Sequence, residues 1–349
     1  MDVLDEALKI LEDAGPEYSG GLINHGPMAA QAMIEMGHDG AVLPWVDYYR
    51  RRLETIRGDF NPVPSDRWRE ALGKADLYGN WTALFTHELA EETWPSILKT
   101  WVPRLAPGMS GAAGHGLIRT SHAVRALEKA DTAPRRNELA RGLAYWASRY
   151  QKLSSEKEPD RSAMTPLEAL QHIPILPEEK KVRFGLTGEK LKALDSFPPF
   201  RAAVNFLDVS AEYILVSELL SAFTAVYRAN ARSIKTVNIF VHTVTAPRGV
   251  RSLLPYLDPG SRQEILRSVW QVCAGLYAVL GNRSLTPDGM PRRLESPANI
   301  AERAVRTGDE HAIKFTEACL HEYSIHPDLT YIEAATDAVE RLLEISRLK

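Results

Sequence analysis

Cysteine is scarce in this chain of 349 residues, which contains only Cys273 and Cys319. Both lie in apolar stretches with helical spacing. The sequence therefore predicts buried free thiols in a reducing compartment and argues against a disulfide framework. A long apolar run is also missing, because the longest one, Tyr213 to Val226, contains Glu218 and is too short to cross a bilayer. We therefore expect a cytoplasmic protein with no membrane partner.

A strong excess of one charge is also absent, since the formal net charge is −3. The densest basic cluster, Arg50-Arg51-Arg52, belongs to the solvated end of a predicted helix. Nucleic acid is therefore not an expected partner, because its binding needs a longer basic surface. The first 15 residues have the pattern of an acidic amphipathic helix, not of a signal peptide.

Three short functional motifs are missing from the sequence. It contains no GxGxxG fingerprint, no P-loop and no HExxH segment. A Rossmann domain for a flavin or a nicotinamide is therefore not visible, and a metal site would have to combine residues that are distant in sequence. Hydrophobic residues make up 44% of the chain and charged residues 25%, which is typical of a soluble globular protein.

Helical periodicity, in contrast, is abundant. The helices that it predicts are 2–13, 27–36, 41–57, 66–72, 81–105 with a break at Pro95, 115–127, 137–150, 200–231, 263–280, 299–322 with a break at Gly308-Asp309, and 330–348. Residues 236–245 are rich in β-branched side chains, which favour a strand by propensity alone. Because helices flank this stretch and no partner strands are evident, we assign it to a helix that ends at Ala246-Pro247. The prediction is an all-α fold, with residues 1–349 in a single compact multi-helix domain.

The middle of the chain departs from this pattern. Residues 151–163 are polar, and residues 164–200 contain five prolines among short helical patches. We interpret 151–200 as an insertion that is either a cap over a pocket or a plain surface segment. Residues 281–297 are expected to form a loop.

A glycine-rich turn leads into the helix predicted from residue 115, in the stretch PGMSGAAGHGLIRTSHAVRAL (107–127). The turn delivers His115 to the start of that helix, because glycines let a backbone approach its surroundings closely. His122 follows seven residues later and returns to nearly the same helix face. Two imidazoles and an apolar stripe would then share one buried surface. The alternative is one capping and one packing histidine.

Three other histidines have similar settings. His25 lies just before the helix that Pro27 begins, His242 lies within an apolar run, and His311 lies near the start of a late helix. Each is either a metal or substrate ligand held by a rigid element, or an ordinary histidine that only packs and hydrogen-bonds within the fold. Spacing alone does not separate the two interpretations.

Lys314 is harder to explain as an ordinary packing residue. It lies three positions after His311 on the same helix face, between Ile313 and Phe315. A buried lysine costs free energy unless it is neutralised or paired. A neutral lysine can react with carbon dioxide to give a carbamate, which is an oxygen ligand. The alternative is that the aliphatic part of the Lys314 side chain packs against apolar neighbours while its ammonium group reaches water.

These residues lie in four segments that resemble the questin oxidase-like family. The segments are YSGGLINHGPMA, GAAGHGLIRTSHAVRALE, FVHTVTAPRGVRSLL and DEHAIKFTEA, and they occur in the family's order over nearly the whole chain. Fungal members open anthraquinone rings oxidatively, an outcome first described as Baeyer–Villiger-like. Some members are all-helical non-haem iron oxygenases, whose iron is held by four histidines and a carboxylated lysine.

The resemblance implies a metal site and a reaction for this chain. Its ligands would be His25, His115, His242, His311 and carboxylated Lys314. The implied cofactors are iron(II), with manganese or zinc as alternatives, and carbon dioxide as the lysine carbamate. The implied partners are dioxygen and an aromatic polyketide-like substrate from secondary metabolism. The metal would lie buried between helices; no oligomeric state is implied.

One segment departs from the family pattern. Fungal relatives have HPLIH where this chain has Ile118-Arg119 at the second histidine position, and His122 comes later instead. We expect His122 to lie beside the site without binding the metal, because seven residues of helix separate it from His115 by about 10 Å along the axis. The pocket walls are expected to include these aromatic residues: Trp45, Phe85, Phe240 and Phe315.

Three other functions are open at the level of sequence. One is an NADPH-dependent Baeyer–Villiger-type oxidase without a bound metal, which the missing dinucleotide motif disfavours. Another is a metal-dependent hydrolase, because a carbamylated lysine also suits zinc or nickel. The last is a helical binding protein that keeps the pocket without catalysis.

Overall fold

Helices form nearly all of the regular structure in the computed structural model, which describes residues 2–56, 58–156, 164–282, 285 and 295–346. The strands within these ranges are β1 (Glu17–Tyr18) and β2 (Leu22–Ile23), which form one antiparallel hairpin. The predicted all-α class is therefore confirmed. No helix in these ranges combines the length and apolar character needed to cross a membrane.

The α-helices follow one another with short connections in most of the chain. They are α1 (Val3–Ile10), α2 (Gly26–Glu35), α3 (Asp39–Tyr49), α4 (Trp68–Ala71), α5 (Tyr78–Glu91), α6 (Trp94–Leu105), α7 (His115–Lys129), α8 (Ala133–Ser148), α9 (Pro166–His172), α10 (Thr187–Lys192), α11 (Glu212–Asn230), α12 (Ile234–Leu253), α13 (Pro259–Leu280), α14 (Pro297–Thr307), α15 (Glu310–Ile325) and α16 (Leu329–Ser346). The 3₁₀ turns are η1 (Arg50–Arg52), η2 (Ala75–Leu77), η3 (Ala106–Gly108), η4 (Gly111–Gly114), η5 (Glu178–Lys180), η6 (Ala193–Ser196), η7 (Pro198–Asn205) and η8 (Leu254–Tyr256).

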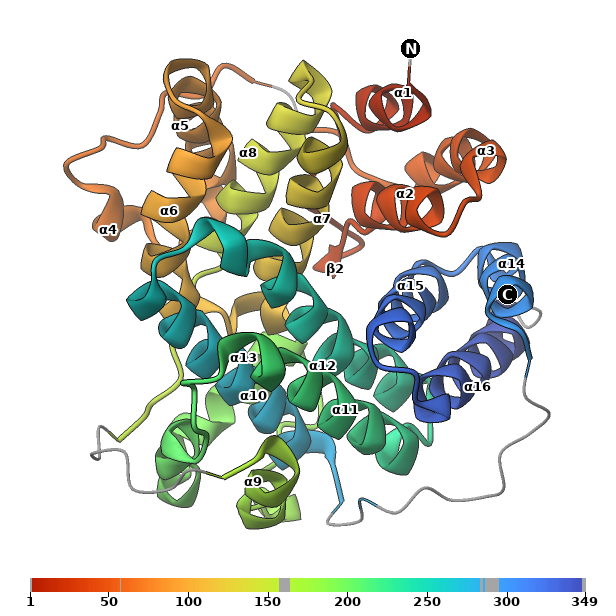
Figure 1. Cartoon of the computed structure of the whole chain (residues 1–349). Coiled ribbons are helices and arrows are strands. Elements are labelled where there is room, and N and C mark those ends of the chain that lie inside the picture. The colour runs from red at the N-terminus through yellow and green to blue at the C-terminus, as the bar shows by residue number, and fades with distance from the viewer. Residues whose placement is uncertain (1, 57, 157–163, 283–284, 286–294, 347–349) are drawn as a thin grey trace.

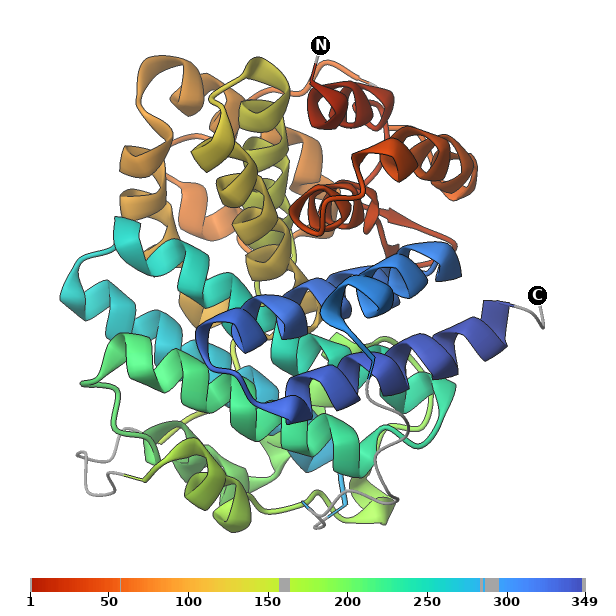
Figure 2. The ribbon, with the colours of Figure 1, turned by 45° about the vertical axis from the view of Figure 1, so that its right-hand side comes forward.

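Four helices form a closed ring of contacts at the centre of the molecule. Helix α7 packs against α2 and α12, and α15 packs against the same two helices. The views in Figures 1 and 2 show α1–α3 on one side of α7 and α5, α6 and α8 on the other, with α11–α13 below them. Residues from four distant parts of the sequence therefore meet inside this central ring of helices.

The apolar core is divided into two clusters. The larger one spans most of the helices from α4 to α16, and the smaller one lies among α1, α2 and α3. Ala126 of α7 and Ile313 of α15 belong to the smaller cluster, so both helices bridge the two. Helix α12 is buried on nearly every face, including the polar side chains of His242 and Arg248.

The prediction of one helix over residues 200–231 is wrong for residues 200–211. Residues 198–205 form the 3₁₀ turn η7, and α11 begins only at Glu212. Between them, the backbone N–H of Met164 donates to the carbonyl of Phe206 (3.1 Å), and Leu207 forms a parallel bridge with Met164. Asp208 then accepts the backbone N–H of Ser210 (2.9 Å). Pairing with a distant segment and a local turn outweigh the helical pattern here.

The predicted end of a helix at Ala246-Pro247 is also wrong, because α12 continues to Leu253. A proline has no N–H to donate to the carbonyl four residues earlier, which here belongs to Thr243. The thiol of Cys273 on α13 lies 3.7 Å from that oxygen and supplies a weak donor. Tertiary packing therefore compensates for the proline, and the prediction of a helix over 236–245 is confirmed.

The segment 151–200 consists of short elements, as its prolines suggest. Its described part holds α9, η5, α10 and η6, and α10 packs against η4 and α13. Residues 157–163 of the polar stretch, and residues 283–284 and 286–294 of the predicted loop 281–297, lie outside the described ranges.

Candidate metal centre

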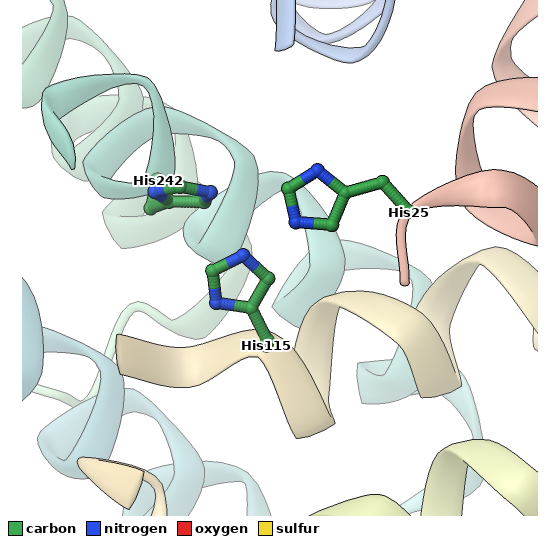
Figure 3. A group of neighbouring side chains, drawn as sticks. All are labelled: His25, His115 and His242. Carbon is green, nitrogen blue, oxygen red and sulfur yellow. The ribbon is translucent and has the colours of Figure 1, made fainter. Parts of the chain in front are cut away.

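The central ring of helices brings four buried or nearly buried histidines together: His25, His115, His242 and His311, called the central histidines below. His25 precedes α2, His115 begins α7, His242 lies within α12, and His311 lies in the first turn of α15. The His115 and His242 ring centroids are 4.2 Å apart, and those of His25 and His311 are 4.7 Å apart. Figure 3 shows the rings of His25, His115 and His242 projecting from separate segments toward a shared space.

One nitrogen from each of three central histidines lies within mutual reach. The ligand atoms of His25, His115 and His242 all lie within 4.8 Å of one another. A second group with the same limit consists of His25, Glu310 and His311. The two groups share His25, so the structure places all four predicted histidines and one carboxylate around a single space.

The glycine-rich turn positions His115 by close packing against the end of α8. A side chain on Gly111 would overlap the carbonyl oxygen of Arg149. The next three residues all have left-handed backbones, with φ of 49° at Ala112, 53° at Ala113 and 83° at Gly114. These left-handed residues reverse the chain so that α7 begins at His115 inside the molecule.

Backbone carbonyls orient two of the imidazole rings. Nδ1 of His115 lies 2.5 Å from the carbonyl oxygen of Ala112, and His242 hydrogen-bonds the backbone of Ile239. In both residues Nε2 is buried and has no hydrogen-bond partner. A carbonyl on one ring nitrogen is the usual device that directs the other nitrogen toward a metal.

His25 and His311 are held through their backbones. The N–H of His25 donates to the hydroxyl of Tyr49 (2.8 Å), and both ring nitrogens of His25 are buried without a partner. Asp309 caps α15 by accepting the backbone N–H of His311 at 2.8 Å. This cap fixes the first turn of α15, from which His311 and Glu310 both project.

Lys314 lies one turn further along α15 and is only 1% exposed. Its Nζ has no hydrogen-bond partner. Burial lowers the pKa of Lys314 to about 8, although the charges of Glu310 and Asp309 act in the opposite direction. The alternative predicted from the sequence, an ammonium that reaches water, is wrong.

Burial also lowers the pKa of His25, His115 and His242 well below the ordinary value. The nearby ammonium of Lys314 and the neighbouring histidines lower these pKa values further. The three imidazoles are therefore neutral, which is the form that binds metals.

His122 belongs to a different network from the central histidines. Nδ1 of His122 lies 2.7 Å from Oε1 of Gln31, and Nη2 of Arg125 lies 2.8 Å from Nδ1 and 3.2 Å from Nε2 of the same ring. Arg125 also pairs with buried Glu317 at 2.5 Å, and Arg248 lies 3.3 Å from the same carboxylate oxygen. His122 thus joins α2 to a buried ionic cluster on α7, α12 and α15.

Arg119, at the position where fungal relatives carry a second histidine, also points elsewhere. Its guanidinium makes two bonds to the carboxylate of Glu138 on α8, at 2.6 and 2.9 Å. The pair is buried and bidentate, and it joins α7 to α8. The departure from the family pattern is therefore a structural ion pair in this chain.

A cavity of about 470 Å³ opens beside the central histidines, all four of which line it. Its other wall residues include both polar and aromatic side chains: Tyr18, Arg52, Tyr145, Arg149, Tyr150, Gln151, Asn238 and Glu310. Residues 186–189 also line it, so the 151–200 segment contributes to the wall. The four aromatic residues predicted from the sequence to line the pocket are not among its wall residues.

Those four predicted aromatic residues lie in the cores instead. Trp45 stacks on Tyr49 and donates from Nε1 to the carbonyl of Gly308 (3.0 Å). Phe85 packs in a cluster with Trp81 and Trp101. The others, Phe240 and Phe315, are fully buried in the larger core. An apolar residue in an apolar helix marks the core as readily as a pocket, so the sequence did not separate the two.

Sequence reasoning missed one residue of the site, Glu310. It is 7% exposed, lines the cavity and belongs to the group with His25 and His311. Its position directly before His311, at the start of an expected helix, was the available signal. That signal is weak, because an acidic residue is also favourable at a helix N-terminus without any site.

An all-α fold that gathers four buried or nearly buried histidines beside a cavity, with an unpaired buried lysine one turn from His311, defines a helical protein with a candidate metal centre. The sequence profile of the questin oxidase-like family matches residues 22–319, which is most of the chain and includes every residue of the centre. The protein belongs to the questin oxidase-like family. No curated protein matches the sequence.

Proposed function

We propose that this protein is a non-haem iron-dependent oxygenase that oxidises, and opens, a ring of an aromatic polyketide-like substrate. The family name supports oxidase chemistry. The observation that carries the metal assignment is the convergence of buried imidazole nitrogens without partners in the central ring of helices. Lys314, also buried and unpaired, supports the same assignment.

The residues present fit a divalent metal. A buried polar atom without a partner costs about 1–3 kcal/mol, and several such atoms meet in this one place. A cation that binds them would offset that cost. The proposed ligands are the central histidines and a carboxylated Lys314. This set of nitrogens and one anionic oxygen suits iron(II), and it also suits manganese or zinc.

Lys314 would supply the anionic oxygen after carboxylation. Its neutral amine adds to carbon dioxide, a nitrogen–carbon bond forms, and one proton leaves to give the carbamate. With a pKa of about 8, roughly a tenth of this amine is neutral at pH 7. The reaction therefore has its reactive form available under ordinary conditions.

Bound iron(II) would supply the electron-transfer chemistry by which dioxygen reacts with an aromatic ring. The side chains of the cavity would bind and orient the substrate. Asn238 lines the cavity and its buried Oδ1 has no partner, so it can accept a hydrogen bond from a phenolic hydroxyl. Tyr145 is held by donating to Glu17 at 2.8 Å, which fixes its ring in the cavity wall.

The test combines metal analysis with oxygen consumption. Protein purified anaerobically is analysed for metals, reconstituted with iron(II) and bicarbonate, and mixed with hydroxyanthraquinones in the presence and absence of NADPH. Stoichiometric iron and substrate-dependent oxygen uptake without NADPH are expected. An absolute NADPH requirement in metal-free protein would identify the Baeyer–Villiger-type oxidase. Zinc or nickel with hydrolysis would identify a hydrolase, and ligand binding without turnover would identify a binding protein.

A further inference from the structure

The second donor group contains a carboxylate that the proposed ligand set does not use. Ligand atoms of His25, Glu310 and His311 lie within 4.8 Å of one another. Two imidazoles and one carboxylate are the protein donors of many non-haem iron(II) sites. This group is complete without any modification of Lys314.

Glu310 is available to bind a cation. Its carboxylate lines the cavity, and its ion-pair partner Arg52 lies 3.8 Å away, which is beyond hydrogen-bond distance. The side chain of Arg52 is 35% exposed, so water can solvate the guanidinium if the pair separates. Unlike the Arg125–Glu317 pair at 2.5 Å, this pair does not hold its carboxylate in a tight bond.

The charge of the centre gives Glu310 a specific role. Before Lys314 is carboxylated, it offers no anionic oxygen and its ammonium repels an incoming cation, while an imidazole binds a metal through an uncharged nitrogen. Glu310 is the carboxylate that shares a donor group with the histidines. We propose that Glu310 is a metal ligand that takes up the cation through the His25–Glu310–His311 group before carboxylation.

This inference rests on the proposed function only in placing a divalent metal among the central histidines. It makes carboxylation of Lys314 a second step, which adds an oxygen donor to a metal already bound. Metal uptake in the absence of carbon dioxide therefore depends on Glu310, and the increase caused by bicarbonate depends on Lys314.

Cobalt(II) titrations followed by equilibrium dialysis and visible absorption separate the two steps. The proteins compared are the wild type, Glu310→Gln, Glu310→Asp, Lys314→Met and the control Glu189→Gln, which removes another carboxylate of the cavity wall. Each is titrated in buffer free of carbon dioxide and again with bicarbonate. Far-ultraviolet circular dichroism verifies that each variant is folded.

Without carbon dioxide, we expect Glu310→Gln to bind cobalt(II) at least tenfold more weakly than the wild type, with an altered visible spectrum. Glu310→Asp should recover part of the affinity, and Glu189→Gln should match the wild type. Lys314→Met should bind at least as tightly as the wild type, because it lacks the ammonium that repels the cation. Bicarbonate should strengthen binding in the wild type and in Glu310→Gln but not in Lys314→Met. If Glu310→Gln and the wild type have equal cobalt(II) affinity and equal spectra without carbon dioxide, the role of Glu310 is overturned but the metal assignment is not. Failure of the wild type to bind cobalt(II) in either buffer would overturn the metal assignment itself.

Discussion

The carbonyl oxygen of Ala112 lies 2.5 Å from Nδ1 of His115, and Ala112 itself has a left-handed backbone with φ of 49°. The residue that orients the imidazole is therefore in a conformation that costs an alanine about 1–2 kcal/mol. The packing of Gly111 against Arg149 and of α7 within the central ring of helices sustains that strain.

Replacing Ala112 by glycine should raise the free energy of unfolding by up to about 1 kcal/mol, because glycine adopts positive φ without a steric cost. Urea denaturation of the metal-free protein measures the change. The matched control is Ala123→Gly in the regular part of α7, which should lower the stability by about 1 kcal/mol or more. A loss of stability in Ala112→Gly equal to that of the control would contradict the assignment of strain.

Replacing His115 or His242 by alanine should abolish metal retention with little loss of helix content. Their unpaired Nε2 atoms face the shared space, whereas the helices that carry them are held by extensive apolar packing. Metal analysis and far-ultraviolet circular dichroism on the same samples check both parts. Exposed His87 supplies the control His87→Ala, which should keep its metal. Full metal occupancy in the His115 and His242 variants would remove both residues from the ligand set.

Replacing His122 by alanine should leave one metal per chain but lower the free energy of unfolding by about 1–3 kcal/mol. The loss arises because the buried imidazole packs between Gln31 and Arg125, and its removal leaves the amide oxygen of buried Gln31 without its contact at 2.7 Å. Metal analysis and urea denaturation provide the two readouts. Loss of the metal at unchanged stability would instead make His122 a ligand.

The Glu317 cluster predicts a dependence of stability on pH. Burial raises the pKa of Glu317, but the charges of Arg125 and Arg248 outweigh burial and lower it from 4.5 to about 2. A carboxyl with this lowered pKa contributes roughly 3 kcal/mol to stability above pH 4.5, and the contribution is lost as the pH falls toward 2.

The stability gap between the wild type and Glu317→Gln should therefore be constant from pH 7 to pH 5 and shrink below pH 4.5. Urea denaturation at a series of pH values measures it. In the control Glu12→Gln, which changes an exposed carboxylate, the difference in free energy of unfolding from the wild type should be small at every pH. A gap for Glu317→Gln that stays constant down to pH 3 would show that the ionised carboxylate is not what the arginines stabilise.

Carboxylation of Lys314 should be visible directly. Protein loaded with metal in ¹³C-labelled bicarbonate should give a carbamate carbon signal in ¹³C NMR, and Lys314→Met should lack it. The matched control is Lys190→Met, since Lys190 is also buried but donates its Nζ to the carbonyl of Gly185. The Lys190 variant should keep the signal. An identical spectrum in wild type and Lys314→Met would rule out carboxylation at this position.

The sequence by itself determined the helical class and most of the residues that form the centre. Helical patterns on both sides of residues 236–245, and the lack of partner strands in the sequence, predicted α12 even though β-branched residues favour a strand. The positions of His25, His115, His242, His311 and Lys314 followed from the family resemblance. Whether Lys314 and the histidines bind a metal stays a prediction.

Tertiary structure alone decided how these residues meet and what surrounds them. The convergence of the central histidines depends on four helices packing in a ring, which no local periodicity specifies. The same is true of Glu310, whose position beside His25 and His311 becomes visible only in the folded chain. Packing also decided that Phe240 lies in the core and that α12 continues through Pro247, where the Cys273 thiol lies 3.7 Å from the freed carbonyl oxygen of Thr243. The physical reason is that side-chain patterns record which face of a helix is buried, whereas the partner of that face depends on contacts between segments far apart in the chain.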